Sequence, residues 1–126
     1  MERLQKEALK AREKAYAPYS NFLVGAALET ESGCIYTGCN IENASFGATV
    51  CAERVAIFKA VADGQTRFNK IAIAASGELT PPCGICLQVM REFNIKTIIL
   101  INQKKQWRSY TLKELLPVSF GPHNLG

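Results

Sequence analysis

The chain has 126 residues, 48% hydrophobic and 21% charged, a balance that excludes an intrinsically disordered protein. No apolar run reaches the roughly 18–20 residues that a membrane-spanning helix needs, and the charged start MERLQKEALKAREK is unlike a secretion signal. The net charge of +4 is spread along the chain, so we expect neither a nucleic-acid partner nor a membrane partner. We predict one cytoplasmic domain over residues 1–126.

Helical and strand patterns alternate along most of the chain. Apolar and small residues recur at helical spacing over 1–16 and predict a first helix there. Two strands are predicted over 22–29 and 34–39, and the short turn between them indicates an antiparallel hairpin. The later elements, in chain order, are a loop over 40–50, a helix over 51–64, a strand over 70–75, a helix over 83–93, a strand over 95–101, a strand over 107–110 and a short helix over 111–117.

This order predicts the fold class. Apolar strands that alternate with helices indicate a mixed five-stranded sheet with helices on both faces, an α/β fold of three layers, α/β/α. The link before 107–110 is too short for a parallel crossover, so the last two strands should also form a hairpin. On the helix over 51–64, we expect Val55 and Phe58 to belong to a broad buried face.

Five cysteines and one histidine limit the chemistry that the chain can perform. Five thiols are too few for a disulfide scaffold, which leaves metal ligation, catalysis or packing. The only histidine, His123, lies near the C-terminus, a poor position for a catalytic base. Any zinc site must therefore be built mainly from thiolates. Cys34 and Cys39 fall on a predicted strand, and we interpret them as packing residues.

Three cysteines stand where two predicted helices begin. Cys51 opens one helix, and Cys83 and Cys86 open the other at i, i+3 spacing. The first turn of a helix carries free N–H groups and partial positive charge, which stabilise the thiolate. Three protein ligands leave a fourth position for water, the arrangement of a catalytic zinc. A lone CxxC is equally typical of a redox pair or half a zinc finger. The third cysteine and the preceding Pro82 favour the zinc site.

Two charged residues follow Cys51 and suit such a site. Glu53 could take a proton from zinc-activated water, although a glutamate in a first helical turn is also favoured by the helix dipole alone. One Zn²⁺ with three thiolates carries a charge of −1, which is costly to bury. Arg54 could offset that charge, and the alternative is an exposed helix arginine.

The pattern C-A-E…P-C-G-I-C resembles the signature of the zinc deaminases in its three-cysteine form. Over nearly its whole length the chain is similar to the small homotetrameric cytidine deaminases. The matching stretches are YSNFLVGAAL, GCNIENASFG, CAERVAI, PCGICLQVMREF and LLPVSFGP. The resemblance implies a cytidine deaminase-like fold, one Zn²⁺ per chain, a homotetramer, and hydrolytic deamination of cytidine and deoxycytidine to uridine and deoxyuridine in pyrimidine salvage, with release of ammonia.

The resemblance also implies a role for each site residue. Cys51, Cys83 and Cys86 match the zinc ligands, Glu53 matches the proton shuttle, and Arg54 matches an arginine that hydrogen-bonds the ligand sulfurs. The substrate contacts that it implies are Asn40 and Glu42 at the ribose hydroxyls, Phe22 beside the pyrimidine, the backbone of Ala52 at the base, and the segments around Phe46 and Phe120, which complete the active sites of neighbouring chains.

Two residues depart from the family pattern: Phe46 stands where tyrosine is usual, and Leu87 where arginine is usual. Three other functions stay open. A deaminase of cytosine within nucleic acid would need a basic or aromatic surface, which the sequence lacks. A deaminase of a cytosine-containing nucleoside analogue would use the same residues. A non-catalytic module would use the three cysteines only to staple the fold.

Overall fold

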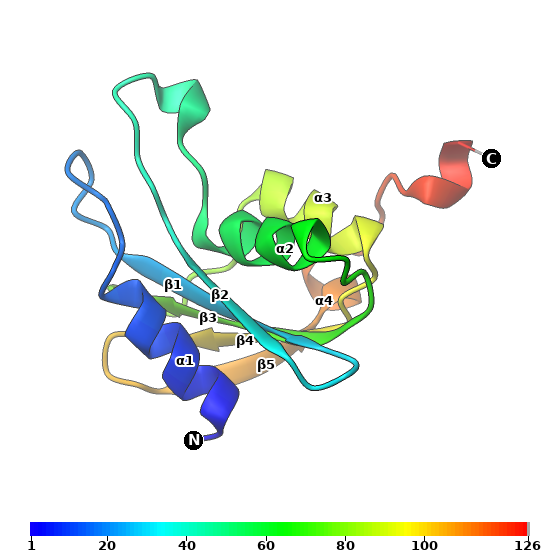
Figure 1. Ribbon diagram of the computed structural model, residues 1–126, viewed down its shortest axis with the longest axis horizontal. Coiled ribbons are helices and arrows are strands. Elements are labelled where there is room, and N and C mark those ends of the chain that lie inside the picture. The colour runs from blue at the N-terminus through cyan, green and yellow to red at the C-terminus, as the bar shows by residue number, and fades with distance from the viewer. Residues whose placement is uncertain (126) are drawn as a thin grey trace.

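One mixed sheet organises the molecule. The computed structural model describes residues 1–125, and its strands lie in the order β2-β1-β3-β4-β5 (Figure 1). Among these strands only β3 and β4 run parallel, and the other neighbours are antiparallel, which confirms both predicted hairpins. The strands are β1 (Val24–Thr30), β2 (Ile35–Cys39), β3 (Phe68–Ala75), β4 (Thr97–Ile101) and β5 (Trp107–Thr111).

Helices cover both faces of this sheet. The α-helices are α1 (Arg3–Arg12), α2 (Ala52–Ala62), α3 (Gly84–Glu92) and α4 (Leu112–Leu115). α1 packs on one face, where Leu4 and Ala8 contact alanines of β1 and β3. α2, α3 and α4 pack on the other face (Figure 1). The predicted mixed α/β fold of three layers is confirmed. No helix in the described chain is long and apolar enough to cross a membrane.

The first helix is shorter than its sequence pattern predicts. α1 ends at Arg12, whereas the pattern extends to residue 16. Tyr16 leaves the helix because its backbone pairs with the loop after β2: its N–H donates to Asn40 O at 2.9 Å, and its carbonyl accepts from Glu42 N at 2.8 Å. Pro18 then prevents a return to helix. The chain from residue 16 onward is therefore anchored along residues 40–42.

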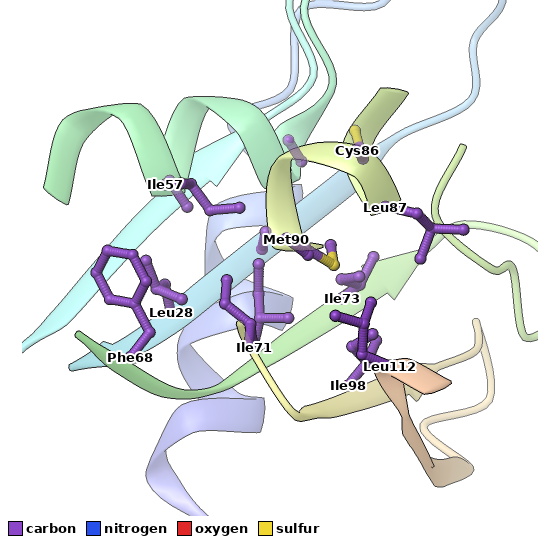
Figure 2. Packing of buried hydrophobic residues seen from close by; sticks show 14 of the residues in the cluster. Leu28, Ile57, Phe68, Ile71, Ile73, Cys86, Leu87, Met90, Ile98 and Leu112 are labelled. Carbon is purple, nitrogen blue, oxygen red and sulfur yellow. The ribbon is translucent and has the colours of Figure 1, made fainter. Parts of the chain in front are cut away.

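The larger core lies between the sheet and α2 and α3. Figure 2 shows Ile57 of α2 and Met90 of α3 above Ile71 and Ile98 of the sheet, all completely buried. The prediction for Phe58 is wrong, since its side chain is 47% exposed. α2 carries apolar residues on every side, so their spacing does not reveal which face packs inward.

The packing prediction for Cys34 is also wrong. Its side chain is exposed and lies in the turn that precedes β2 rather than on the strand. Cys39, at the end of β2, is half-buried, and its thiol donates to Lys14 O at 3.4 Å. Neither cysteine belongs to the group formed by Cys51, Cys83 and Cys86.

Two glycines allow the helices to approach the sheet closely. A Cβ atom on Gly25 of β1 would lie 2.2 Å from Ala8 O of α1. A Cβ atom on Gly38 of β2 would lie 2.5 Å from Ala52 O of α2. Both distances are too short for a real side chain, so the absence of a side chain sets the spacing. Gly38 therefore fixes the height of the first turn of α2, where Cys51 stands.

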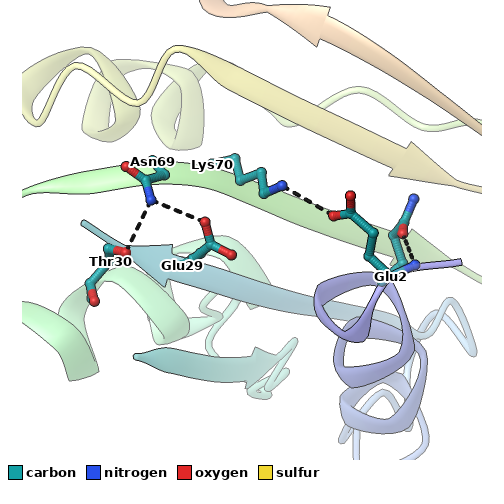
Figure 3. Close-up of polar contacts among 6 residues, drawn as sticks. Glu2, Glu29, Thr30, Asn69 and Lys70 are labelled. Carbon is teal, nitrogen blue, oxygen red and sulfur yellow. Dashed lines mark hydrogen bonds and ion pairs between the residues drawn. The ribbon is translucent and has the colours of Figure 1, made fainter. Parts of the chain in front are cut away.

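Polar contacts also join β3 to the start of α1 and to the end of β1 (Figure 3). Lys70 Nζ of β3 lies 3.1 Å from Glu2 Oε2 at the start of α1. Asn69 Nδ2 donates to Glu29 Oε1 at 3.0 Å and to Thr30 O at 3.2 Å, where the register of β1 shifts. These contacts fix the first helix and the irregular end of β1.

Candidate metal and catalytic site

The three predicted ligands come together at the start of two helices. Cys51 caps α2, Cys83 caps α3, and Cys86 stands in the first turn of α3. Their sulfur atoms all lie within 4.8 Å of one another, and the Sγ atoms of Cys51 and Cys83 are 3.8 Å apart. Cys86 is buried while Cys83 is exposed, so the cluster lies between the core and solvent.

The sulfurs perturb one another strongly. The hydrogen bond from the Cys86 thiol lowers the pKa of Cys51 to about 5, and a hydrogen bond from Arg54 acts in the same direction. The same contact with Cys51, followed by burial, raises the pKa of Cys86 well above its ordinary value. Three thiolates this close repel one another unless a cation lies between them. Soft sulfur donors on three sides, with one side facing the pocket, fit Zn²⁺.

Glu53 is buried beside this cluster. Its side chain is 4% exposed, and burial raises the pKa of its carboxyl to about 7, with a smaller contribution from the charge of Cys51. Together with Cys51 and Cys83 it lines a pocket of about 210 Å³. Glu53, Cys51 and Cys83 therefore border one small, largely apolar space.

Arg54, in the first turn of α2, contacts one of the clustered sulfurs. Its Nη2 donates to Cys51 Sγ at 3.6 Å, and this hydrogen bond, partly opposed by burial, raises the pKa of the guanidinium. Its Nε is buried and finds no partner within residues 1–125. The guanidinium charge therefore lies beside one sulfur, and the role of Arg54 in offsetting the charge of three thiolates stays a prediction.

The other side of the pocket is formed by the segments that begin and follow the β1–β2 hairpin. Of the predicted substrate contacts, Phe22, Asn40 and Ala52 line the pocket. Several lining residues were not predicted from the sequence: Thr49 and Val50 before Cys51, and Thr80 and Pro81 before Cys83. Their closeness to the motif cysteines was the only signal that could have indicated them. Val24, Ile73 and Ala75 line it from β1 and β3, and only the sheet register brings them there.

Three predicted contacts do not line this pocket within the described chain: Glu42, Phe46 and Phe120. The Glu42 carboxylate accepts hydrogen bonds from the backbone N–H groups of Tyr19 and Ser20 and from the Ser20 hydroxyl. Phe46 is 78% exposed and Phe120 is 58% exposed. Both lie on segments that project from the body of the molecule (Figure 1).

A larger cavity of about 550 Å³ lies between α3, α4 and the C-terminal segment. It is lined by basic groups that include Arg91, Lys96 and Lys113, and by His123. It contains none of the three clustered thiols and no carboxylate. The smaller pocket therefore remains the candidate site.

Comparisons with known proteins agree with this geometry. The family model described as the cytidine and deoxycytidylate deaminase zinc-binding region matches residues 1–102. A cytidine deaminase of Sporosarcina psychrophila is 48% identical, over 99% of this chain and 94% of that protein. The crystal structure of a cytidine deaminase from Burkholderia pseudomallei superimposes with a TM-score of 0.89 at 45% identity, over 95% of this chain and 100% of that one. A Mycobacterium tuberculosis cytidine deaminase gives a TM-score of 0.80 at 37% identity, over 94% of each chain.

Proposed function

This chain belongs to the cytidine and deoxycytidylate deaminase family, and we propose that it is a zinc-dependent cytidine deaminase. It hydrolyses cytidine and deoxycytidine to uridine and deoxyuridine and releases ammonia. The observation that carries the proposal is the pocket that the buried Glu53 lines together with Cys51 and Cys83, two of the three clustered thiols. The relatives named above support the substrate, since each is called a cytidine deaminase.

Cys51, Cys83 and Cys86 hold one Zn²⁺ per chain. Bound there, the ion supplies Lewis-acid chemistry that activates water for hydrolysis. The positive ends of α2 and α3 favour the thiolate form of the ligands, because all three stand at the cap or in the first turn. The guanidinium of Arg54 offsets part of the excess negative charge through Cys51 Sγ.

Glu53 moves the protons of the reaction. Its carboxylate takes a proton from the attacking water and delivers it to N3 of the cytosine ring. It then takes the second proton of the water from the hydroxyl group added at C4 and transfers it to the departing amino group, which leaves as ammonia while C4 becomes the carbonyl of uridine. Burial suits this role, because a carboxyl held away from bulk water exchanges its proton with the bound substrate rather than with solvent.

The lining of the pocket supports a nucleoside as substrate. Apolar groups of Phe22 and Val24 suit the faces of a pyrimidine ring, and the backbone of Ala52 suits a polar edge of the base. Asn40 and Glu42 stand two residues apart on the loop after β2, and we assign them to the ribose hydroxyls. Glu42 reaches the sugar from the rim of the pocket rather than from its wall.

Assembly completes the site in this proposal. Phe46 and Phe120 lie on projecting segments, where each can cover the pocket of a neighbouring copy. A closed homotetramer would use both segments at every site and would exclude water around the base. We also keep a single domain over 1–126, a cytoplasmic location and the lack of a nucleic-acid partner as predictions.

The test is incubation of the zinc-loaded protein with cytidine, followed by the ultraviolet absorbance of the base and by ammonia release. Deoxycytidine, free cytosine and a single-stranded oligonucleotide that contains cytosine are compared at equal base concentration. The proposal expects turnover of both nucleosides and none of the oligonucleotide. Absence of turnover with either nucleoside, in protein that holds one zinc per chain, would refute it.

A further inference from the structure

The side chain of Ser20 lies at a junction of hydrogen bonds beside the pocket. Its hydroxyl donates to Glu42 Oε2 and accepts from the backbone N–H of Phe22 at 3.0 Å. Its own backbone N–H donates to Glu42 Oε1 at 3.1 Å, and Tyr19 N–H donates to the same oxygen at 2.9 Å. One serine hydroxyl therefore links a carboxylate assigned to the sugar with a residue that lines the base pocket.

The backbone between Ser20 and Phe22 has an unusual conformation. Asn21 has a φ of 57°, in the left-handed region that only a few residue types adopt readily. Such a turn needs contacts that hold it. The Phe22 N–H is held by Ser20, and the Phe22 carbonyl is held by Asn40 Nδ2 at 2.8 Å. Asn40 Oδ1 also accepts from Val24 N–H at 2.9 Å.

These contacts limit what the Glu42 carboxylate can still do. A carboxylate offers about four acceptor positions. Three are occupied: two on Oε1 by backbone N–H groups, and one on Oε2 by the Ser20 hydroxyl. One acceptor position on Oε2 stays free, and the direction in which it points depends on the Ser20 bond. A single free acceptor of fixed direction suits one hydroxyl of a sugar.

We infer that Ser20 is a positioning residue for the nucleoside sugar, acting through Glu42 and through the backbone of Phe22. The inference rests on the proposed function. Ser20 does not itself line the pocket in the described chain, and it lies on neither α2 nor α3. Its removal should therefore weaken binding of the nucleoside in its ground state and transition state alike, which raises KM and leaves kcat nearly unchanged.

The experiment compares Ser20→Ala, which removes the hydroxyl, with Ser20→Thr, which keeps it. Ser32→Ala is the matched control: Ser32 is an exposed serine whose hydroxyl also makes local bonds, to Thr30 and Cys34 in the β1–β2 turn. We expect Ser20→Ala to raise the KM for cytidine about tenfold, as for loss of a hydrogen bond to a charged group, with kcat within about twofold. Ser20→Thr should restore most of the KM, and Ser32→Ala should match the parent.

A double-mutant cycle tests whether Ser20 acts through Glu42. If it does, Ser20→Ala in a Glu42→Gln background should raise KM by clearly less than it does in the parent. Zinc content, measured on every variant, should stay at the parental value, and the melting temperature of each variant should show that it is folded at the assay temperature. An unchanged KM in Ser20→Ala, a fall in kcat alone, or full additivity with Glu42→Gln would overturn the inference. These outcomes need an active parent, so failure of the proposed function is seen separately, as a parent without turnover.

Discussion

The metal side of the pocket, formed by the three cysteines and Glu53, differs in burial from the two segments that we assign to its cover, those around Phe46 and Phe120. The sulfurs and Glu53 stand on α2 and α3, whose inner faces pack on the sheet, and Glu53 and Cys86 are buried. Phe46 and Phe120 stand on projecting segments and are mostly exposed. The two phenylalanines belong to neither of the buried core clusters of the described chain.

The two parts of the proposed enzyme thus depend on different contacts. The residues that we assign to metal binding and proton transfer all lie in one chain, and their positions depend on its own core. We assign enclosure of the substrate to two segments whose phenylalanine side chains remain mostly exposed in the single chain. Chemistry should therefore be sensitive to changes within the chain, and enclosure should be sensitive to changes in assembly.

The largest effect should come from Glu53→Gln. The amide keeps the shape of the side chain but cannot carry the proton, so we expect kcat to fall at least by the roughly 10²–10⁴-fold typical of general acid–base catalysis. Zinc content should be unchanged, as measured by metal analysis. The control is Glu92→Gln at the exposed end of α3, which should keep parental activity. Activity of Glu53→Gln within tenfold of the parent would contradict the assigned role.

Removal of residues 118–126 should remove one of the two segments assigned to the cover of the pocket, the one that carries Phe120. We expect a loss of activity of about 10²-fold, since displaced groups around a substrate can cost this much without touching the chemistry. Zinc content should stay at one per chain, because all three ligands lie outside the removed segment. Light scattering of the parent under assay conditions gives the state of assembly. Full activity of the parent as a monomer would contradict the proposal that a neighbouring copy covers the pocket.

Arg54→Gln should lower the affinity of the site for zinc without abolishing zinc binding. Loss of the guanidinium leaves the three thiolates less compensated, and residues that support metal ligands typically contribute 10–100-fold to metal affinity. In a competition with a chelator, Arg54→Gln should therefore release its zinc faster, and a lower chelator concentration should suffice to remove it. Arg108→Gln on β5, an exposed arginine far along the sequence from the cluster, serves as the control. Equal zinc retention in both variants would argue against charge compensation.

The smallest expected effect is the pH dependence of stability that Glu42 contributes. The hydrogen bond from Ser20 holds the pKa of Glu42 below its ordinary value, with help from the backbone N–H groups of Ser20 and Tyr19. A carboxyl whose pKa is lowered by folding stabilises the folded chain at pH values above the ordinary pKa of the group. This stability is lost as the pH falls through the lowered pKa. The melting temperature of Glu42→Gln should thus lie slightly below that of the parent at neutral pH. The difference should shrink on acidification, and a difference that grows would contradict this sign.

The local order of elements was predictable from the sequence because it depends on neighbours in the chain. Helix starts at Cys51 and Cys83, the i, i+3 sulfurs and both hairpins follow from short-range spacing. The end of α1 and the exposure of Phe58 were not predictable, since they depend on contacts between distant segments. The same holds for the bonds of Glu42: residues 19 and 42 meet only after Tyr16 pairs with the loop that follows β2.

The close contact between Gly38 and α2 makes metal affinity depend on a residue that has no functional group of its own. A methyl group there would meet Ala52 O and the backbone N of Ala56 and would lift α2 from β2. Cys51 would move with α2, whereas Cys83 and Cys86 would stay on α3. Thiolate–zinc distances tolerate deviations of only about 0.2 Å. A screen of random variants for lost activity would therefore identify position 38 together with the ligands, although it carries no side chain and touches no substrate.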